Sequence, residues 1–468
     1  MNSNQICVIR SQCTLLTALM LLILSGCKND SQDHADAPWQ SLFDGKSLAG
    51  WEQKGGQAIY EVKDGTIVGK TVRNTPNSFL VTKKNYSDFI LEVELKVNPA
   101  MNSGIQIRSN SFPYYQKGRV HGYQVEVDPS ERAWSGGIYD EGRRGWLYDL
   151  SADPEAQAAF KPDHWNHYRI EAIGDTLKTW INGVPTAHLV DEKTRSGFIG
   201  LQVHSIGEDE EEGKQVMWRN LRLLTENLQD YTKATPLTPR ITKNELTSQE
   251  KKDGWEMLWD GATTAGWRGA KLKTFPESGW KIEQGILTVL PSGGAESRGG
   301  GDIVTTELYG DFELKLDFRI TEGANSGIKY YVDTDLNKGE GSAIGLEYQI
   351  LDDDVHPDAK LGRMEGIRTM SSLYDLIRAD PEKPVHPVGE WNTASIISRD
   401  GHVEHWLNGF KVLEYERGSP EFRRLVAESK YAIWPNFGEL ARGRILLQDH
   451  GNEVSFKNIK IRPIENLK

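Results

Sequence analysis

Two stretches in the second half of the chain would place polar side chains of different chemical kinds on one face of a β-sheet. Glu347 and Gln349 are two residues apart between apolar neighbours, and Gln448 and His450 are also two apart. Side chains two apart in a strand point to the same face. Lys329, from a third alternating stretch, adds an ammonium group. Together these groups could hold sugar hydroxyls by hydrogen bonds and transfer protons.

The first half of the chain offers a similar set on alternating positions of NSGIQIRS, GYQVEVD and LQVH. Its members are Gln106, Arg108, Gln124, Glu126, Gln202 and His204. The plain alternative is that both polar faces are ordinary solvated sheet surfaces. The recurrence of Gln-x-His in two divergent copies favours a functional interpretation, because this pair is not a typical choice for a solvent face.

Glu126, Asp128 and Glu131 suggest a different chemistry. Their spacing resembles the E-x-D-x-x-E pattern of laminarinase- and lichenase-type retaining glycosidases, in which the outer carboxylates would serve as nucleophile and acid. Pro129 interrupts the strand between these acids. The second half of the chain has no third acid in register. Both observations disfavour this alternative.

An acidic loop could bind a metal. Asp352, Asp354 and His356 lie close together in the sequence. Carboxylate oxygens are ligands that hard divalent cations prefer. A solvated acidic loop without a metal is the other interpretation, and it is the commoner one for such runs.

An internal repeat must position these residues. Several short motifs occur twice in the same order. Among them are NSGI at 102–105 and 325–328, LYDL at 147–150 and 373–376, and LQxH at 201–204 and 447–450. The long period predicts two tandem domains rather than a solenoid.

Each repeat has the pattern of β-structure. FILEVELKV and FELKLDFRI alternate apolar with polar residues at period 2. Asn182-Gly183 and Asn408-Gly409 are strong hairpin-turn signals. Helical patterns are few. We therefore expect an all-β fold of two tandem antiparallel sandwiches or jelly rolls, in which the last strand of each repeat pairs with the first.

The chain begins with a targeting signal. Arg10 precedes an apolar run that is short for a membrane span, and the run ends in Leu24-Ser25-Gly26-Cys27, which resembles the bacterial lipobox. We expect Cys27 to carry a lipid that anchors the protein to the bacterial envelope. Lys28 follows in place of an aspartate. By resemblance to lipoprotein sorting, this favours the outer membrane, facing the periplasm or the cell surface.

Composition excludes several functions. The net charge is −12, and the loss of one arginine with the signal peptide makes it −13, so nucleic-acid binding is not expected. All three cysteines lie at or before Cys27, which leaves the folded part without a disulfide, a zinc–thiolate site or a cysteine nucleophile. Membrane contact is expected only through the lipid anchor.

These features predict an order of segments along the chain. They are a lipoprotein signal peptide at 1–26, a polar tether at 27–37, the first repeat at 38–224, a linker at 225–253 and the second repeat at 254–466.

The second repeat resembles the bacterial 3-keto-disaccharide hydrolase domain family. The matching stretches, which cover nearly all of it, are EYQILDDDVHPDAK, SSLYDLI, GEWNTASI, HVEHWLNG and LLQDHGNEVSFKNIKIR. The first repeat is similar to a more divergent branch. It exchanges Glu and Gln, because Gln124 aligns with Glu347 and Glu126 aligns with Gln349.

The resemblance implies concanavalin-like jelly rolls that act on 3-keto-glycosides or other oligosaccharides, by a 3-keto-glucoside lyase route or with a hydratase step that gives net hydrolysis. A ketone at C3 acidifies the C2 proton, so that a base can remove it while the C1 oxygen leaves. No cofactor is required in this chain, because a separate sugar 3-oxidoreductase would act upstream. A divalent metal cation could stabilise the enolate.

The strand faces on which these side chains lie suggest their roles. The candidate base and acid are Glu347 and His450, with Glu126 and His204 as counterparts in the first repeat. The groups expected to bind substrate are Lys329, Gln349, Gln448, Tyr374, Gln124, Gln202 and Arg108, the last as counterpart of Lys329. A non-catalytic carbohydrate-binding lipoprotein is the alternative from another class, because fold alone does not decide function.

Overall fold

A computed structural model describes residues 37–464 of the chain. The expected signal peptide, the expected lipidation site Cys27 and nearly all of the expected tether lie outside the described residues. Within residues 37–464, none of the helices has the length and apolar character needed to cross a membrane.

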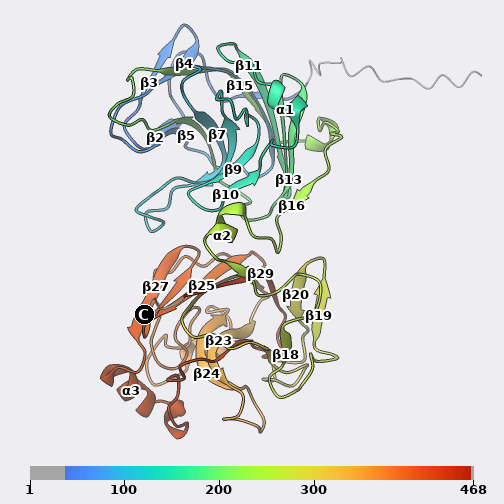
Figure 1. The fold of residues 1–468 in the computed structure, drawn as a ribbon, viewed down its shortest axis with the longest axis vertical. Helices are drawn as coiled ribbons and strands as arrows, with labels where there is room; N and C mark the ends of the chain where they lie inside the picture. The colour runs from blue at the N-terminus through green and yellow to red at the C-terminus, as the bar shows by residue number, and fades with distance from the viewer. Residues whose placement is uncertain (1–36, 465–468) are drawn as a thin grey trace, which may run out of the picture. The chain divides into compact units, whose positions relative to one another are not determined.

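The first repeat is built from two sheets (Figure 1, blue to green). We call one the back sheet. Its strands, in spatial order, are β16 (Arg240–Ile241), β13 (Val184–Val190), β12 (Thr176–Ile181), β11 (Asn166–Ile173), β6 (Phe89–Val97), β15 (Gln215–Leu224), β4 (Thr66–Lys70) and β3 (Ile59–Lys63), with β1 (Gln40–Ser41) paired to β15. We call the other the site sheet. Its strands are β10 (Gly145–Tyr148), β9 (Ile138–Glu141), β8 (His121–Val127), β7 (Ser103–Asn110), β14 (Phe198–Val203), β5 (Ser78–Thr82) and β2 (Trp51–Gly55).

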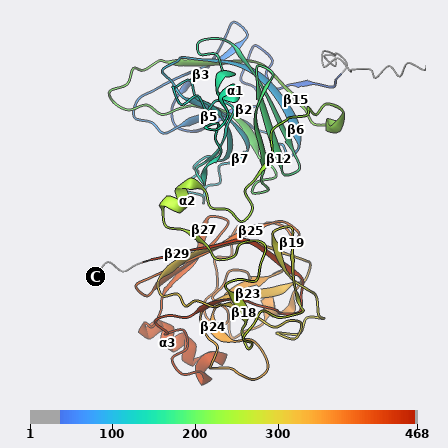
Figure 2. The ribbon, with the colours of Figure 1, turned by 45° about the vertical axis from the view of Figure 1, so that its right-hand side comes forward.

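The second repeat has the same two layers, which Figure 2 shows with β25, β27 and β29 in one and β18, β23 and β24 in the other. The back sheet contains β19 (Trp280–Glu283), β20 (Ile286–Val289), β29 (Val454–Pro463), β22 (Phe312–Ile320), β25 (Asn392–Arg399), β26 (His402–Leu407) and β27 (Phe410–Glu416), with β17 (Glu256–Met257) beside β29. The site sheet contains β18 (Trp267–Gly269), β21 (Ile303–Thr305), β28 (Arg444–Leu447), β23 (Asn325–Asp333) and β24 (Ile344–Leu351).

Helices are short and lie outside the sheets. They are α1 (Pro154–Ala158), α2 (Ser248–Lys252) and α3 (Pro420–Ala427), with single 3₁₀ turns at η1 (Leu228–Asp230), η2 (Pro357–Lys360) and η3 (Lys430–Ile433). The expected all-β fold of tandem jelly-roll sandwiches is therefore confirmed. So is the closing of each repeat by its last strand, because β15 pairs with β1 and β29 pairs with β17.

Alternation along the central strands builds each core. The residues of β6 and β22 that face inward are fully buried; they are Phe89, Leu91, Val93 and Leu95, and Phe312, Leu314, Leu316 and Phe318. Each such side chain contributes about 1.5–3 kcal/mol on burial. The two predicted hairpins are also present, because Asn182 and Asn408 adopt positive φ angles of 50° and 51° at the turns after β12 and β26.

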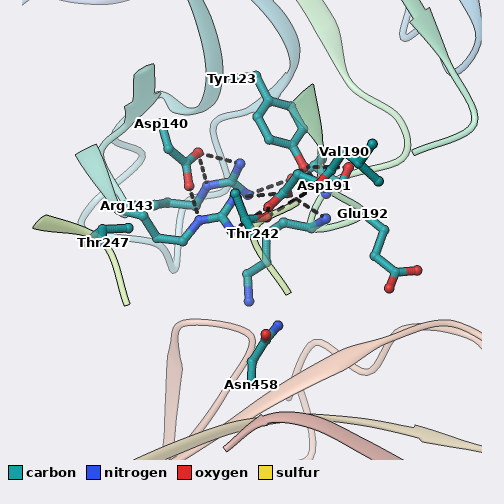
Figure 3. A network of polar contacts seen from close by, with 12 residues as sticks. Tyr123, Asp140, Arg143, Val190, Asp191, Glu192, Thr242, Thr247 and Asn458 are labelled. Atoms are coloured by element: carbon teal, nitrogen blue, oxygen red, sulfur yellow. Dashed lines mark hydrogen bonds and ion pairs between the residues drawn. The ribbon is translucent and has the colours of Figure 1, made fainter. Parts of the chain in front are cut away.

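The segment 225–253 is more structured than its polar composition suggests. It contributes β16 to the back sheet of the first repeat and begins α2 with a capping box at Thr247. Figure 3 shows how it is held, because the Thr242 hydroxyl donates to the carboxylate of Asp191. Arg144 binds the same carboxylate, with Nη1 2.8 Å from Oδ2. Although burial opposes it, this guanidinium keeps the pKa of Asp191 below its usual range.

A buried histidine connects the two sheets of the second repeat. His405 Nδ1 lies 2.9 Å from the carbonyl oxygen of Ser371, and Nε2 lies 2.8 Å from the Tyr330 hydroxyl. Because a carbonyl only accepts, Nδ1 carries the hydrogen and Nε2 accepts from Tyr330. Burial lowers the pKa of His405 to about 4, so the neutral ring is the form that the fold stabilises.

We predict that His405→Ala lowers the free energy of unfolding by about 3 kcal/mol, because it leaves a cavity, removes the ring partner of the Ser371 carbonyl and removes one of the two partners of the Tyr330 hydroxyl. His402→Ala, at a partly exposed histidine on the opposite face of the same strand, should cost less than about 1 kcal/mol. Because the folded pKa of His405 is depressed, its contribution is present above about pH 6.5 and is lost as the pH falls toward 4. Urea unfolding at pH 7 and pH 4.5 measures both effects. Equal costs for the two variants would contradict the assignment.

Candidate active site

The site of the second repeat is a polar face on the site sheet, opposite the core. Ile328, Leu346 and Tyr348 point inward, so that Lys329 and Glu347 point to the other side. These two residues are directly opposite each other on β23 and β24, and Lys329 Nζ lies 3.4 Å from Glu347 Oε2. The prediction that they share a face is confirmed.

Gly327 leaves room for the carboxylate of Glu347. A Cβ atom at Gly327 would lie 2.6 Å from Glu347 Oε1, which is too close for real atoms. We call the residues that lie opposite one another across neighbouring strands a row. In the row next to that of Lys329 and Glu347, Gly327 lies between Gln349 and Gln448. With the amide of Gln349 turned so that its nitrogen faces Glu347, it donates to Oε1 at 3.1 Å. Its oxygen then faces Asn325 Oδ1 at 3.1 Å, so the amide of Asn325 must turn as well to donate a hydrogen bond.

The charges of this pair are set by burial and by each other. Burial raises the pKa of Glu347 although Lys329 acts to lower it. Burial would lower the pKa of Lys329, but Glu347 and Asp302 outweigh it, and the pKa of the ammonium is raised. A carboxylate of raised basicity beside a fixed cation suits proton abstraction next to a developing negative charge.

Two supporting residues were not predicted from the sequence. Lys329 Nζ donates to Ser342 Oγ at 2.5 Å, and Ser342 donates to the buried carboxylate of Asp302. Asp302 follows a run of glycines, and its position beside Lys329 depends on a long-range fold. No local pattern marks either residue.

The two other predicted side chains of this face have free polar atoms. Gln448 is 3% exposed, its Nε2 donates to Glu296 Oε1 at 3.1 Å, and its Oε1 has no partner among the described residues. His450 Nδ1 is also buried without one. The ring of His450 lies edge-on to that of His356, with centroids 6.2 Å apart. Buried polar atoms without partners indicate positions where a ligand or water binds.

Tyr374 borders Glu347 through its backbone. The Tyr374 amide donates to the Glu347 carbonyl at 3.0 Å, and its hydroxyl donates to Asp358 Oδ2 at 2.8 Å. Burial is the largest cause of the raised pKa of Tyr374. Lys430 from η3, which the sequence did not indicate, places its ammonium 4.4 Å from the centre of the Tyr374 ring.

The proposed metal ligands are used mainly in local hydrogen bonds. Asp352 accepts from the backbone amides of Gly323 and Asp354 at 2.8 and 3.3 Å, and His356 Nδ1 accepts from the amide of Asp358 at 3.1 Å. Asp354 is exposed. The described residues contain one group with metal-ligand spacing, on the back sheet, formed by His402, Glu404 and Glu414. Lys411 already binds both of these glutamates.

The first repeat gathers its amides and its acid into one hydrogen-bonded chain. Gln106 Nε2 donates to Gln124 Oε1 at 2.6 Å, and Gln124 Nε2 donates to Glu126 Oε2 at 3.0 Å. Asn102 donates to the other oxygen of Glu126 at 2.6 Å. Burial raises the pKa of Glu126 to about 7 although both amides act to lower it. Gln202 is fully buried, and neither end of its amide has a partner among the described residues.

The expectation that Arg108 shares the face of Gln106 is wrong. A β-bulge after Ile107 shifts the register, and Arg108 adopts a φ of 46°. Its guanidinium therefore turns to the carbonyls of Ser87 and Gly174 and to Asp88. In the matching bulge of the second repeat, the side chain of Tyr331 likewise turns away from the site face to Ser398, and Lys329 stays on that face. In register, the counterpart of Lys329 is Gln106.

One pairing of repeated motifs also changes. The backbone amide of Glu126 donates to the carbonyl of Gly137, as the backbone amide of Gln349 donates to that of Ser372. Two residues further along the chain, Tyr139 therefore occupies the position of Tyr374. The LYDL at 147–150 instead reaches to the end of β10. The first repeat has an additional hairpin, β9–β10, which the identical sequence motifs did not reveal.

The remaining candidates of the first repeat lie at its edges. His204 is half-buried just after β14, with Nδ1 2.8 Å from the Ser205 carbonyl oxygen. Glu131 is exposed in the turn after β8. Asp128, between Glu126 and Glu131 in the sequence, is bound by Arg132, whose Nε lies 2.7 Å from Oδ2.

Two hollows lie on the back sheets, away from these faces. One of about 630 Å³ is bordered by Trp39, Glu92 and Arg222, and one of about 220 Å³ by Arg319 and Glu453. The buried carboxylate of Glu92 in the larger hollow is already bound by two arginines.

The fold and its two polar faces define a tandem jelly-roll protein. Residues 38–224 and 254–462 each match the family model described as the 3-keto-alpha-glucoside-1,2-lyase-like domain, and the chain belongs to this family. It is 37% identical over 233 residues to a protein of Bacteroides thetaiotaomicron named 3-keto-disaccharide hydrolase, covering 46% of this chain and 79% of that protein.

Two solved structures are also similar. A Parabacteroides distasonis protein described as a glycosyl hydrolase is 32% identical, with a TM-score of 0.42, over 48% of this chain and all of that one. The carbohydrate-binding module CBM66 of Bacillus subtilis is 17% identical, with a TM-score of 0.28, over 37% of this chain and 93% of that one.

We predict that Glu126→Gln flattens the pH dependence of stability. Because the folded pKa is about 7, above the ordinary value of the unfolded chain, the stability that the protonated carboxyl contributes is lost as the pH rises through 7. This group should cost the wild type about 2–3 kcal/mol between pH 5 and pH 8. The measurement is urea unfolding across that range, with the exposed Glu131→Gln as the control. Parallel curves for wild type and Glu126→Gln would show that the carboxyl titrates normally.

Proposed function

We propose that this protein hydrolyses 3-keto-disaccharides and that the reaction takes place on the site sheet of the second repeat. The observation that carries this proposal is the buried pair of Lys329 and Glu347, 3.4 Å apart, in a chain of this family. The name of the Bacteroides thetaiotaomicron relative supports the substrate class.

In the proposed route, Glu347 removes the proton from C2 of the 3-keto sugar. The electron pair of that C–H bond moves toward the C3 carbonyl, where Lys329 stabilises the enolate oxygen. Burial helps both steps, because it makes the carboxylate more basic and strengthens the attraction between the cation and the developing anion.

The glycosidic bond at C1 then breaks as the C1–C2 double bond forms. His450, in its protonated form, gives a proton to the leaving oxygen, and Gln448 and Gln349 hold the sugar hydroxyls. Water then adds back across the double bond. His450 takes one proton of the water as its oxygen bonds to C1, and Glu347 returns its proton to C2, so that both residues regain their starting forms and one water is consumed for each bond cleaved. Without this addition, the same residues would perform a lyase reaction.

The substrate must be supplied already oxidised. We infer that a separate sugar 3-oxidoreductase installs the C3 ketone, because the steps above use a ketone and no redox chemistry. Elimination then depends on that ketone, and an unoxidised glycoside, whose C2 proton is not acidic, would not react.

We predict that the full-length protein releases nitrophenol from nitrophenyl 3-keto-α-glucoside and leaves nitrophenyl α-glucoside intact. Glu347→Gln should lower kcat at least about 1000-fold, because it removes the base. The matched control is Glu283→Gln, at an exposed acid paired with Lys281 on the back sheet, which should retain wild-type kcat. Equal cleavage of both substrates would indicate a conventional glycosidase. Activity of Glu347→Gln equal to that of the wild type would remove the site assignment.

We further propose that a lipid on Cys27 anchors the protein to the bacterial envelope, on the basis of the lipobox-like Leu24-Ser25-Gly26-Cys27. Cys27→Ala should move the protein from the membrane pellet to the soluble fraction. Cys13→Ala, inside the same signal, should leave it in the pellet. A salt-resistant membrane association of Cys27→Ala would contradict the anchor.

A further inference from the structure

The two site sheets can be compared row by row, because their register is known. One row of the second repeat holds Lys329 opposite Glu347. The same row of the first repeat holds Gln106 opposite Gln124. Both charges of the proposed hydrolytic pair are therefore replaced by neutral amides.

The carboxylate of the first repeat lies in the next row and is fully engaged. Glu126 is opposite Gly104, in the position that Gln349 has in the second repeat. Its two oxygens accept from Asn102 and Gln124 at 2.6 and 3.0 Å. Arg132 lies 3.9 Å from Oε1 of Glu126, and among residues 37–464 no lysine forms an ion pair with this acid. Proton abstraction beside a fixed ammonium, as proposed for the second repeat, has no equivalent here.

The first repeat instead has aromatic rings where its site sheet continues into β9 and β10. Tyr139 is opposite Gln124, and Trp146 is opposite Tyr139, so these side chains extend the same face. Trp134 packs edge-on to Trp146 with ring centroids 4.8 Å apart. The guanidinium of Arg132 lies over both indoles, at 4.8 and 5.0 Å. In the second repeat, the site sheet ends at β24.

A buried amide on the same face has no partner. Gln202 is 0% exposed, and both its Oε1 and its Nε2 lack a hydrogen bond within the described part of the chain. It flanks Gly104 on one side as Glu126 does on the other. Leaving a buried amide unpaired costs about 1–3 kcal/mol, which a ligand that binds it would offset.

We propose that the site sheet of the first repeat is a glycoside-binding site that holds a pyranose ring without cleaving it. The apolar C–H face of one ring of the glycoside packs against Trp146 on β10, and the free amide of Gln202 on β14, four strands further across the same sheet, binds a hydroxyl of another part of the ligand. Amides suit uncharged hydroxyls, which both donate and accept. Aromatic side chains with a few convergent polar groups are typical of small-molecule sites. Hydrolysis then belongs to the second repeat alone, a division of roles that rests on the proposed function.

The test is isothermal titration of the full-length protein with nitrophenyl α-glucoside, which lacks the reactive ketone. Trp146→Ala should weaken binding to the first repeat at least tenfold. Trp165→Ala, at a half-buried tryptophan that packs against Arg219 on the back sheet, is the matched control and should bind as wild type does. Wild-type affinity and stoichiometry in a folded Trp146→Ala variant would overturn the proposal.

Gln202→Leu separates a ligand role from a structural one. Because the amide makes no hydrogen bond, a leucine of similar size should leave the unfolding midpoint unchanged or raise it, while affinity falls at least tenfold. A loss of stability with unchanged affinity would contradict the site. The kinetic arm uses Glu347→Gln on nitrophenyl 3-keto-α-glucoside. If about half of the turnover remains, the first repeat cleaves, and the division of roles is wrong. If the wild type shows no turnover, only the proposed function fails, because the titration needs none.

Discussion

Two opposite charges buried on a sheet face form the interaction on which the site of the second repeat depends. Lys329 and Glu347 lie 3.4 Å apart at positions that are 6% and 5% exposed. Taking both charges out of water is costly, and their attraction offsets this only when other groups complete their hydrogen bonds. Ser342 and Asp302 do so for the ammonium. The bare backbone of Gly327 gives the carboxylate its space.

Much of the fold could be predicted, because it depends on local patterns. Alternation in β6 and β22, the Asn-Gly turns and the repeated motifs are all visible in the sequence, and each corresponds to a structural element. The same alternation placed Glu347 and Gln349 correctly on one face. These successes have one physical cause, which is that side chains of a regular strand alternate strictly between two environments.

The predictions that failed concern places where this regularity is broken. The bulges at Arg108 and Tyr331 insert a residue with positive φ, and the side chain of that residue turns away from the site face. Neither is a glycine, so no residue type announced the break. Asp302 and Lys430 were missed for another reason. They reach the site from a glycine-rich loop and from η3, segments whose course is decided by tertiary packing, and a single sequence contains no signal for such proximity.

The two repeats show how one scaffold can carry two chemistries. Relative to the second repeat, the acid of the first lies one row further along its strand, and the lysine is replaced by an amide. The backbone under these rows is the same, with Gly104 and Gly327 at equivalent positions. A few side chains therefore convert a charged face into an amide chain without a change in strand register. Family membership of both repeats does not imply that they perform the same reaction.

A hydrogen-bonded cluster in the core also positions the chain segment that borders the site. Ser371, with a φ of 65°, presents its carbonyl to His405 between the sheets and its backbone amide to the carbonyl of Gln349. Its hydroxyl donates to Tyr348, which is itself part of the core. Three residues later, the backbone of Tyr374 binds that of Glu347. A polar cluster within the sandwich thus determines where the chain passes beside the proposed base. Stability and site geometry therefore depend on the same buried hydrogen bonds in this repeat, because His405 binds Ser371, three residues before the backbone contact of Tyr374 with Glu347.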